Sequence, residues 1–559
     1  MSTILSLTTA CSSVVGETPT DTRHPDTTES TSTTTPMRRC LDFSLRSANV
    51  DTGALATDAL HLSGERFTCS DDVVVVGSGN LTEIAAAAQL AASLSAPMLF
   101  PHPQLPAELG RLNPLRVHVV GELTVTAPPG VQVEAHDIAS AAALTAATLG
   151  DTVQIAESRN GIDGRFIVEV VRAISSGDRV VTGPVASSGS APTSPTLPPP
   201  HDIDQVQMIK DLSISNESPQ VWMVPASSPE HLLLAAAAAA PVGVSVIAVD
   251  AGDILAHPSL SLALEGHSPD STRFIGSSPA VDPWHIDVLA NGVEVPGGGF
   301  LILPQDRPRR YVAFYGHPET SALGALGEQG PTATLERMEP FLDAYAGDGS
   351  QVIPAFEMIA SVAAAGATDD ADYSFEWPIS TFDDWIATAR ERDVYVVLDL
   401  QPGRDDFLTQ AKQYQPLLEL PFVGLALDPE WRLEPDQVHL RQVGSVSSEE
   451  VNQVIHWLAD LVREKGLPQK LMIVHQFRTF MIQDRELLEQ RPEIQLVIQM
   501  DGDGTEPQKD NTYAALNVGA EDAFWAWGWK NFFDEDEPGP PTPESTMSKQ
   551  PTPVYVSYQ

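Results

Sequence analysis

Basic residues are scarce in this sequence. Lys and Arg together number 32 among 559 residues, against 75 Asp and Glu, so the formal net charge is −43. Such a surface repels nucleic acids and anionic membranes, and we expect no nucleic-acid partner. The charge does not by itself name a partner, because an acid-rich proteome adapted to salt has the same composition. The length exceeds what one hydrophobic core supports and predicts about two to four domains.

Long apolar runs are also lacking, and cysteine is rare. The run around Ala235–Ala240 ends at Pro241 and is too short to span a membrane. Of the three cysteines, Cys11 follows the residues LTTA and so resembles the lipobox of bacterial lipoproteins, which implies a lipid anchor on Cys11 and an extracytoplasmic location. A free cysteine in a disordered tail is the alternative. Cys40 and Cys69 remain as an even pair, which predicts a disulfide in an exported protein.

Several catalytic motifs are missing as well. The sequence contains no GxSxG elbow for a serine nucleophile and no HExxH zinc motif. Gly77-Ser78-Gly79 lacks both the third glycine of the dinucleotide fingerprint and a Walker lysine, which argues against nucleotide binding. A metal-dependent hydrolase stays an alternative, because four residues of suitable type occur in the C-terminal half: His317, His475, Asp399 and Asp501. We nevertheless expect no metal and no cofactor, since these residues show no recognised ligand spacing.

The first half of the chain combines polar segments with α/β patterns. Residues 12–36 are rich in Ser, Thr, Asp and Pro, which predicts a solvated tether, and a Ser/Pro/Thr linker is expected at 187–200. Between them, strands are expected at 73–76, 97–100 and 117–121, with an Ala-rich helix at 81–94. A degenerate second copy has strands at 221–225, 244–249 and 273–276 and a helix at 229–240. Alternating strands and helices predict parallel sheets with right-handed crossovers.

Parts of this region resemble a known repeat. The strand Val73–Val76, the Ala-rich run Ile84–Ala92 and the segment Leu112–Gly121 are similar to the type 2 cell-wall-binding repeat of Gram-positive surface proteins. The resemblance implies attachment to a cell-wall polymer or another glycan. An α/β scaffold that binds nothing is the alternative.

From Arg310 onward, strands and helices alternate to the end of the chain. Strands are expected at 311–315, 352–356, 395–400, 422–428, 471–476, 494–500, 524–527 and 554–558. Helices are expected at 334–346, 381–392, 405–418 and 448–465. Eight strands within about 250 residues predict a (β/α)8 barrel.

Acidic residues recur at the ends of these predicted strands. In FVGLALDPEW, from Phe422 to Trp431, alternation places the small residues and then Asp428 and Glu430 on the lumen side. The same alternation turns three further acids inward from other strands: Glu357, Asp399 and Asp501. Catalytic groups of such barrels lie at the C-terminal ends of the strands, so these five acids are the expected catalytic residues.

The chemistry expected of them is sugar hydrolysis. Two carboxylates over a sugar ring can divide the roles of acid and base or nucleophile. The D-x-E of Asp428 and Glu430 resembles the pair in lysozyme-like and chitinase-like barrel glycosidases, which implies that Glu430 donates the proton with Asp428 as its partner. Substrate-binding side chains are expected among the aromatic and polar groups nearby: Tyr315, His317, Trp431, His475, Gln499, Trp527 and Trp529.

The sequence therefore predicts an α/β protein in three parts. These are a leader and tether at 1–36, a tandem wall-binding-like α/β region with parallel sheets at 37–303, and a TIM barrel at 304–559. We expect an envelope lipoprotein of a Gram-positive bacterium that associates with the wall and acts on a polysaccharide by carboxylate acid/base chemistry. A non-catalytic wall-binding protein with a degenerate barrel is the alternative.

Overall fold

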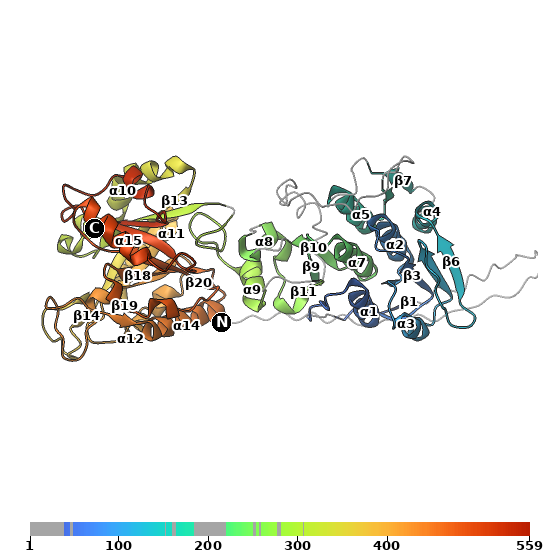
Figure 1. The fold of residues 1–559 in the computed structure, drawn as a ribbon, viewed down its shortest axis with the longest axis horizontal. Coiled ribbons are helices and arrows are strands. Elements are labelled where there is room, and N and C mark those ends of the chain that lie inside the picture. Colours follow the sequence, from blue (N-terminus) through green and yellow to red (C-terminus); the bar gives the residue numbers. More distant parts are fainter. Residues whose placement is uncertain are drawn as a thin grey trace, which may run out of the picture. The chain divides into compact units, whose positions relative to one another are not determined.

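The computed structural model describes residues 39–44, 48–150, 153–158, 164–183, 220–249, 253–256, 259–276, 281–305 and 307–559 (Figure 1). The predicted leader with Cys11, the tether and the linker at 187–200 lie outside these residues. Within them, no helix combines the length and the apolar character needed to cross a membrane.

A four-stranded parallel sheet forms the first α/β unit. Its strand order is β4-β3-β5-β6. The strands are β3 (Asp72–Val76), β4 (Met98–Leu99), β5 (Arg116–Val120) and β6 (Gln132–His136), and the helices are α2 (Leu81–Leu94), α3 (Leu105–Leu112) and α4 (Ile138–Leu149). All five residues of β3 are buried, as a valine-rich central strand requires. Asn80 caps α2 by accepting the Thr82 amide hydrogen, so the turn after β3 leads directly into this helix.

Shorter elements flank this sheet. They are β1 (Arg39–Leu41), α1 (Leu55–Arg66), β2 (Phe67–Ser70), β7 (Gln154–Glu157), α5 (Gly164–Ser176) and β8 (Arg179–Thr182). Cys40 and Cys69 are opposite each other in the β1–β2 pair and form a disulfide with a Cα–Cα distance of 5.0 Å. Strands β7 and β8 make a separate parallel pair.

A three-stranded parallel sheet forms the second α/β unit, in the order β10-β9-β11. Its elements are β9 (Val221–Pro225), α7 (Pro229–Ala239), β10 (Ser245–Val249), α8 (Ser259–Leu264), β11 (Thr272–Phe274) and α9 (Pro283–Asn291). In both sheets the first strand lies in the interior of the sheet and the next two strands of the chain flank it. Each sheet therefore changes direction at its first strand, β3 or β9. That the two units are copies of one repeat stays a prediction.

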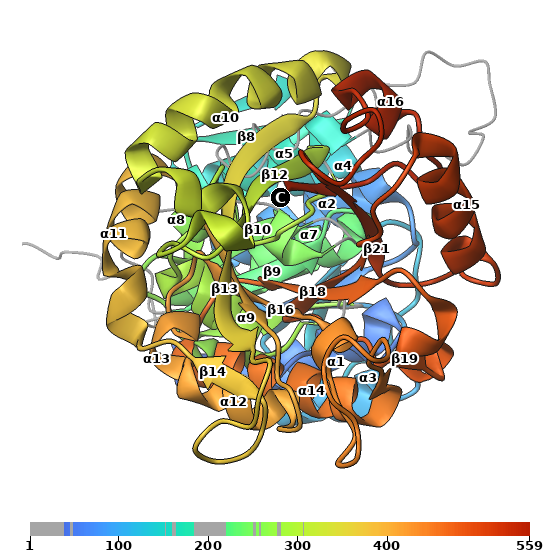
Figure 2. The same cartoon turned by 90° about the vertical axis from the view of Figure 1, so that its left-hand side faces the viewer.

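The C-terminal part is a closed barrel of eight parallel strands, seen end-on in Figure 2 inside its ring of helices. The strands are β12 (Arg309–Gly316), β13 (Gln351–Ala363), β15 (Tyr395–Leu400), β16 (Val423–Leu427), β18 (Lys470–Gln476), β20 (Ile494–Met500), β21 (Ala526–Asn531) and β22 (Tyr555–Tyr558). The helices are α10 (Pro331–Tyr345), α11 (Asp383–Arg392), α12 (Phe407–Gln413), α13 (Gln415–Leu418), α14 (Ser448–Lys465), α15 (Glu506–Asn517) and α16 (Pro543–Met547). The predicted barrel is confirmed.

Smaller strands decorate the barrel. β14 (Ser374–Glu376) pairs antiparallel with the end of β13, and β17 (Val446–Ser447) pairs with β19 (Ile482–Gln483). The seventh barrel strand, predicted at 524–527, instead spans Ala526–Asn531, so this prediction was wrong by several residues.

The lower part of the lumen is filled by apolar and aromatic side chains. Tyr311, Ala355, Tyr395 and Ala426 belong to this inner cluster. A Cβ at Gly424 would lie 2.4 Å from the Leu471 carbonyl oxygen and 3.0 Å from Cε1 of the Tyr395 ring, so there is no room for a side chain at this position. Because the lumen is packed at this level, polar groups gather only above it, at the C-terminal ends of the strands.

Candidate functional site

Charged side chains from six strands meet at the C-terminal end of the barrel. We call them the barrel cluster: Glu357, Asp399, Asp428, His475, Asp501 and Lys530, each at most 8% exposed. Each lies two residues beyond a lumen-facing residue of the same strand, so strand alternation turns all six inward.

His475 is held by a carboxylate at each ring nitrogen. Its Nδ1 lies 2.7 Å from Asp501 Oδ2, and its Nε2 lies 2.9 Å from Glu357 Oε1. Burial alone would lower the pKa of His475, but the charges and hydrogen bonds of Asp501 and Glu357 outweigh it and raise the pKa well above its usual value. The imidazole therefore carries both protons and donates one to each neighbour.

Lys530 supplies the second cation. Its Nζ lies 3.1 Å from Asp501 Oδ1 and 3.6 Å from the centre of the Tyr315 ring. Burial tends to raise the pKa of Asp501, but Lys530 and His475 hold it well below its usual range. Asp501 is thus the permanently ionised carboxylate of the cluster.

Two other carboxyls of the barrel cluster resist ionisation. Burial, with the nearby charge of Glu357, raises the pKa of Asp399 to about 6. Burial, with the charges of Asp399 and Asp501, raises the pKa of Asp428 well above its usual value. The cluster places four carboxyls against two cations, so full ionisation would leave two negative charges uncompensated inside the barrel. Retained protons relieve this excess.

Asp399 also has an oxygen that is free to bind. Its Oδ2 accepts the Tyr315 hydroxyl hydrogen at 2.8 Å, while its Oδ1 is buried and has no hydrogen-bond partner. Gln499, three strands further round the barrel on β20, has a similar arrangement. Its Nε2 donates to Ser557 at 2.6 Å, and its Oε1 is buried without a partner. Two unpartnered acceptors inside a barrel are suited to the hydroxyl groups of a ligand.

Glu430 lies outside the buried cluster. Asp428 caps a 3-10 turn at Pro429–Trp431 by accepting the Glu430 amide hydrogen at 3.1 Å, and this turn carries Glu430 to a half-buried position. Burial and the charge of Asp501 raise the pKa of Glu430 to about 7. A carboxyl with this pKa exchanges its proton readily near neutral pH.

The structure separates the predicted substrate-binding residues into two groups. Tyr315, His475 and Gln499 lie in the lumen with the acids. The others lie elsewhere: His317 packs against Trp377 with ring centres 4.1 Å apart, Trp431 meets His439 edge-on, and Trp527 and Trp529 pack against Tyr513 in the layer between strands and helices. The tryptophan pair therefore offers no surface to a sugar in the lumen.

Two residues of the site, Lys530 and Tyr555, were not predicted from the sequence. The Tyr555 hydroxyl donates to Glu357 Oε2 at 3.2 Å, and Lys530 neutralises Asp501. The signal for Lys530 was present in AWGWKN, the sequence of β21, where large and small residues alternate. Placing the strand at 524–527 ended it before Lys530 and obscured that pattern.

A metal site in the barrel cluster fits the donor set poorly. Asp399, Asp428 and His475 offer ligand atoms within 4.8 Å of one another. Both ring nitrogens of His475, however, already lie within hydrogen-bond distance of a carboxylate, so a metal ion would have to displace one of these contacts. His317, the other predicted ligand, is not part of this group.

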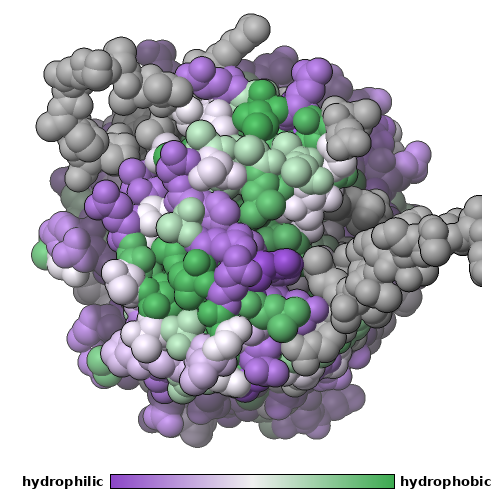
Figure 3. Space-filling view, turned by 90° about the vertical axis from the view of Figure 1, so that its right-hand side faces the viewer, coloured by the Kyte–Doolittle hydropathy of each residue, from purple (hydrophilic) through white to green (hydrophobic). Residues whose placement is uncertain are grey.

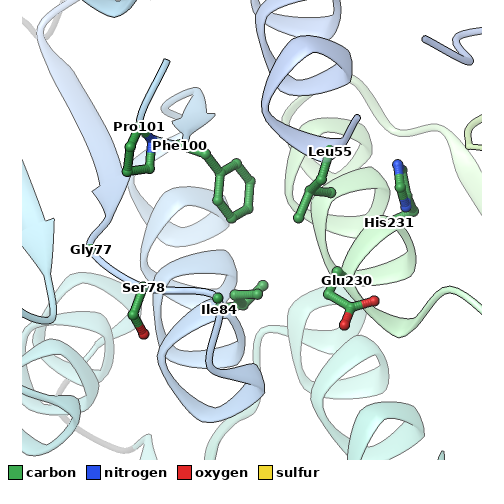
Figure 4. Close-up of a pocket in the computed structure, with 9 residues that line it drawn as sticks. Leu55, Gly77, Ser78, Ile84, Phe100, Pro101, Glu230 and His231 are labelled. Carbon is green, nitrogen blue, oxygen red and sulfur yellow. The ribbon is translucent and has the colours of Figure 1, made fainter. Parts of the chain in front are cut away.

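A cavity of about 480 Å³ lies beyond the C-terminal end of β3 and beside the first turn of α7 (Figure 4). Ligands of open α/β sheets bind at such positions, where the strand order changes direction. Phe100 and Leu55 project into the cavity, and Ser78 and Glu230 supply polar groups, as Figure 4 shows. An apolar surface with a few polar groups suits a sugar ring.

Comparisons with known proteins do not identify a family. No family model matches the sequence, and no curated protein matches it. Among solved structures, the chain is similar to Cwp6 from Clostridium difficile, with 14% identity and a TM-score of 0.35 over 64% of this chain and 63% of that one. It is also similar to Cwp8 from Clostridium difficile, with 17% identity and a TM-score of 0.35 over 44% and 52% of the chains. This chain spans less than two thirds of either protein.

The charge state of His475 predicts a pH dependence of stability. Its pKa is raised on folding, so its stabilising contribution is complete below about pH 6.5, the unfolded value, and is lost as pH rises toward the folded value. In this window His475 contributes one more bound proton to the native state than to the unfolded state, so its own share of the fall in the free energy of unfolding is up to about 1.4 kcal/mol per pH unit. The measurement is urea unfolding between about pH 6.5 and 8.5.

His475→Gln should flatten this slope. His456→Gln is the matched control, because His456 is an exposed histidine that also pairs with a glutamate, Glu489, at 2.9 Å. Equal slopes for wild type and His475→Gln would show that the buried imidazole is not the group that titrates.

Proposed function

We propose that the barrel hydrolyses a glycosidic bond, with Glu430 as the general acid. The observation that carries this proposal is the contrast between two neighbouring carboxyls. The pKa of Glu430 is raised to about 7, whereas that of Asp501 is held well below its usual range. When the surroundings separate the pKa values of two carboxyls in this way, the one with the higher pKa keeps its proton and the other stays negatively charged.

In this mechanism Glu430 protonates the leaving oxygen as the glycosidic C–O bond breaks. A water molecule adds to the anomeric carbon and releases a proton to solvent, from which Glu430 is protonated again. Asp501 stays ionised between His475 and Lys530, and its charge favours the positive character that develops on the sugar ring in the transition state. Asp428 acts through the main chain, because its side chain fixes the turn that orients Glu430. The unpartnered oxygens of Asp399 and Gln499 are available to position sugar hydroxyls.

We further propose that the substrate is a polymer of the cell envelope. Support comes from the resemblance of residues 73–121 to wall-binding repeats and from the sugar-sized cavity beside Gly77, Ser78 and Gly79. A lipid anchor on Cys11 belongs to the same proposal and would keep the protein beside that polymer. The alternative, a wall-binding protein with an inert barrel, shares the binding step but lacks the acid chemistry.

Glu430→Gln should lower turnover by about 10²- to 10⁴-fold, the usual cost of losing a general acid. Wild-type kcat/KM should also fall as pH rises above about 7, because Glu430 then loses its proton. The assay measures new reducing ends released from peptidoglycan, chitin-type polymers and wall polysaccharides.

Glu434→Gln is the matched control, since Glu434 is an exposed glutamate a few residues further along. Unchanged activity in Glu430→Gln would refute the assignment of the acid. A folded wild type that is inert on every glycan would favour the non-catalytic alternative.

Wall binding can be tested separately, with the full chain carrying Glu430→Gln. This protein should sediment with purified cell walls, and adding Gly79→Trp should release it into the supernatant. Gly79 lines the cavity, and a Cβ added there would have no neighbouring atom within 4 Å, so a large side chain fits without a clash at its base. Gly64→Trp, at an equally open glycine in α1, is the control. Equal sedimentation of the two variants would contradict a role for the cavity.

A further inference from the structure

A second cluster of ionisable residues lies on the first α/β sheet, away from the barrel. It consists of His118 on β5 and Glu134 and His136 on β6. In the register of the two parallel strands, His118 is paired with Glu134 and Val120 with His136. Since residues two apart on a strand point to the same side, all three side chains lie on one face of the sheet.

Three potential ligand atoms converge there. His118 Nδ1 lies 3.1 Å from His136 Nε2 and 3.5 Å from Glu134 Oε2, and the last two atoms are 3.9 Å apart. A tetrahedral zinc ion with bonds of about 2.0–2.1 Å holds its ligand atoms about 3.3 Å from one another. Two of the three separations therefore match a triangular face of a zinc site, and the third, between Glu134 and His136, is longer.

Asp72 on β3 orients His118. The His118 Nε2 lies 3.0 Å from Asp72 Oδ1, and Arg116 binds both oxygens of the same carboxylate at 2.6 and 2.9 Å. A carboxylate paired with a guanidinium accepts a hydrogen bond, so His118 carries its proton on Nε2. Its Nδ1 then presents a lone pair toward Glu134 and His136. Metal-ligating histidines are supported by carboxylates in this same way.

With a neutral His118, hydrogen bonding leaves one contact of the cluster unfavourable. His136 Nε2 can donate a hydrogen bond to His118 Nδ1, which satisfies those two atoms. It leaves the Glu134 carboxylate 3.5 Å from the His118 lone pair, where two electron-rich atoms repel each other. A cation bound between the three atoms removes this repulsion.

We propose that His118, Glu134 and His136 bind a divalent transition-metal ion of the zinc class, with Asp72 as the positioning residue. Binding places the ion on the two histidine lone pairs and one carboxylate oxygen, and any proton on His136 Nε2 leaves to solvent. A fourth tetrahedral position remains for water or an external ligand.

The ion can reach this site from solvent. β6 is the edge strand of its sheet, and the side chain of Glu134 is 32% exposed. Figure 3 shows the side of the molecule that bears β6, where patches of hydrophilic and of apolar residues lie side by side. The proposal does not depend on barrel activity.

The experiment uses the full chain, stripped with EDTA, incubated with ZnCl₂ and passed through a desalting column. Zinc is then measured by mass spectrometry, and Co²⁺ loading is followed through its visible absorption bands. We expect one zinc per chain and a cobalt spectrum with nitrogen ligands. His136→Gln and Glu134→Gln should each lose the metal, and Asp72→Asn should weaken affinity about 10- to 100-fold.

Two controls separate this site from other histidines. His456→Gln changes an exposed histidine paired with a glutamate, and His475→Gln removes the only histidine of the barrel cluster. Both should keep the full zinc content. Circular dichroism establishes whether each variant is folded. If His136→Gln does not fold, Glu134→Gln provides the test. A wild type that retains no zinc, or zinc that is lost only with His475→Gln, would overturn the proposal.

Discussion

The barrel depends on the burial of more negative than positive charge in its lumen. Four carboxyls and two cations share this space. His475 links two of the carboxyls, because its ring nitrogens contact Asp501 and Glu357. A buried ion pair stabilises only when its hydrogen bonds are satisfied, and removal of one partner leaves a costly charge. The ionised Asp501 and the raised pKa values of Asp399 and Asp428 all follow from this balance.

The packed lower lumen and the strand geometry make this arrangement specific. Tyr395 fills the space beside Gly424, so polar side chains have room only at the C-terminal ends of the strands. There, the capped turn after β16 places Glu430 outside the barrel cluster, in a half-buried position where the charge of Asp501 still raises its pKa. The near-neutral pKa of this carboxyl is thus produced by its burial and by the charges of its neighbours.

Strand alternation in the sequence was enough to predict the barrel and the inward direction of Asp399, Asp428 and Asp501. Alternation did not predict the position of Glu430, because the strand ends before it. Asp428 caps a turn there, and the alternating pattern of a strand does not extend into a turn. Lys530 and the outward direction of Trp527 were missed because the boundary of β21 was misplaced. Glu134 and His136 were overlooked for a related reason, since β6 is a polar edge strand with only half-buried or exposed positions and gives little hydrophobic signal. Their convergence with His118 depends on register between strands, which one sequence does not specify.

The charge balance of the barrel requires His475 to be a buried imidazolium. Nitrogen NMR of the full chain with ¹⁵N-labelled histidine tests this directly, with His475→Gln identifying the signals. At about pH 8 an ordinary histidine is neutral, with one protonated nitrogen. For His475 we predict protons on both ring nitrogens at that pH, with imidazolium chemical shifts. A neutral ring with one unprotonated nitrogen would contradict this charge balance, on which the proposed chemistry of the barrel depends.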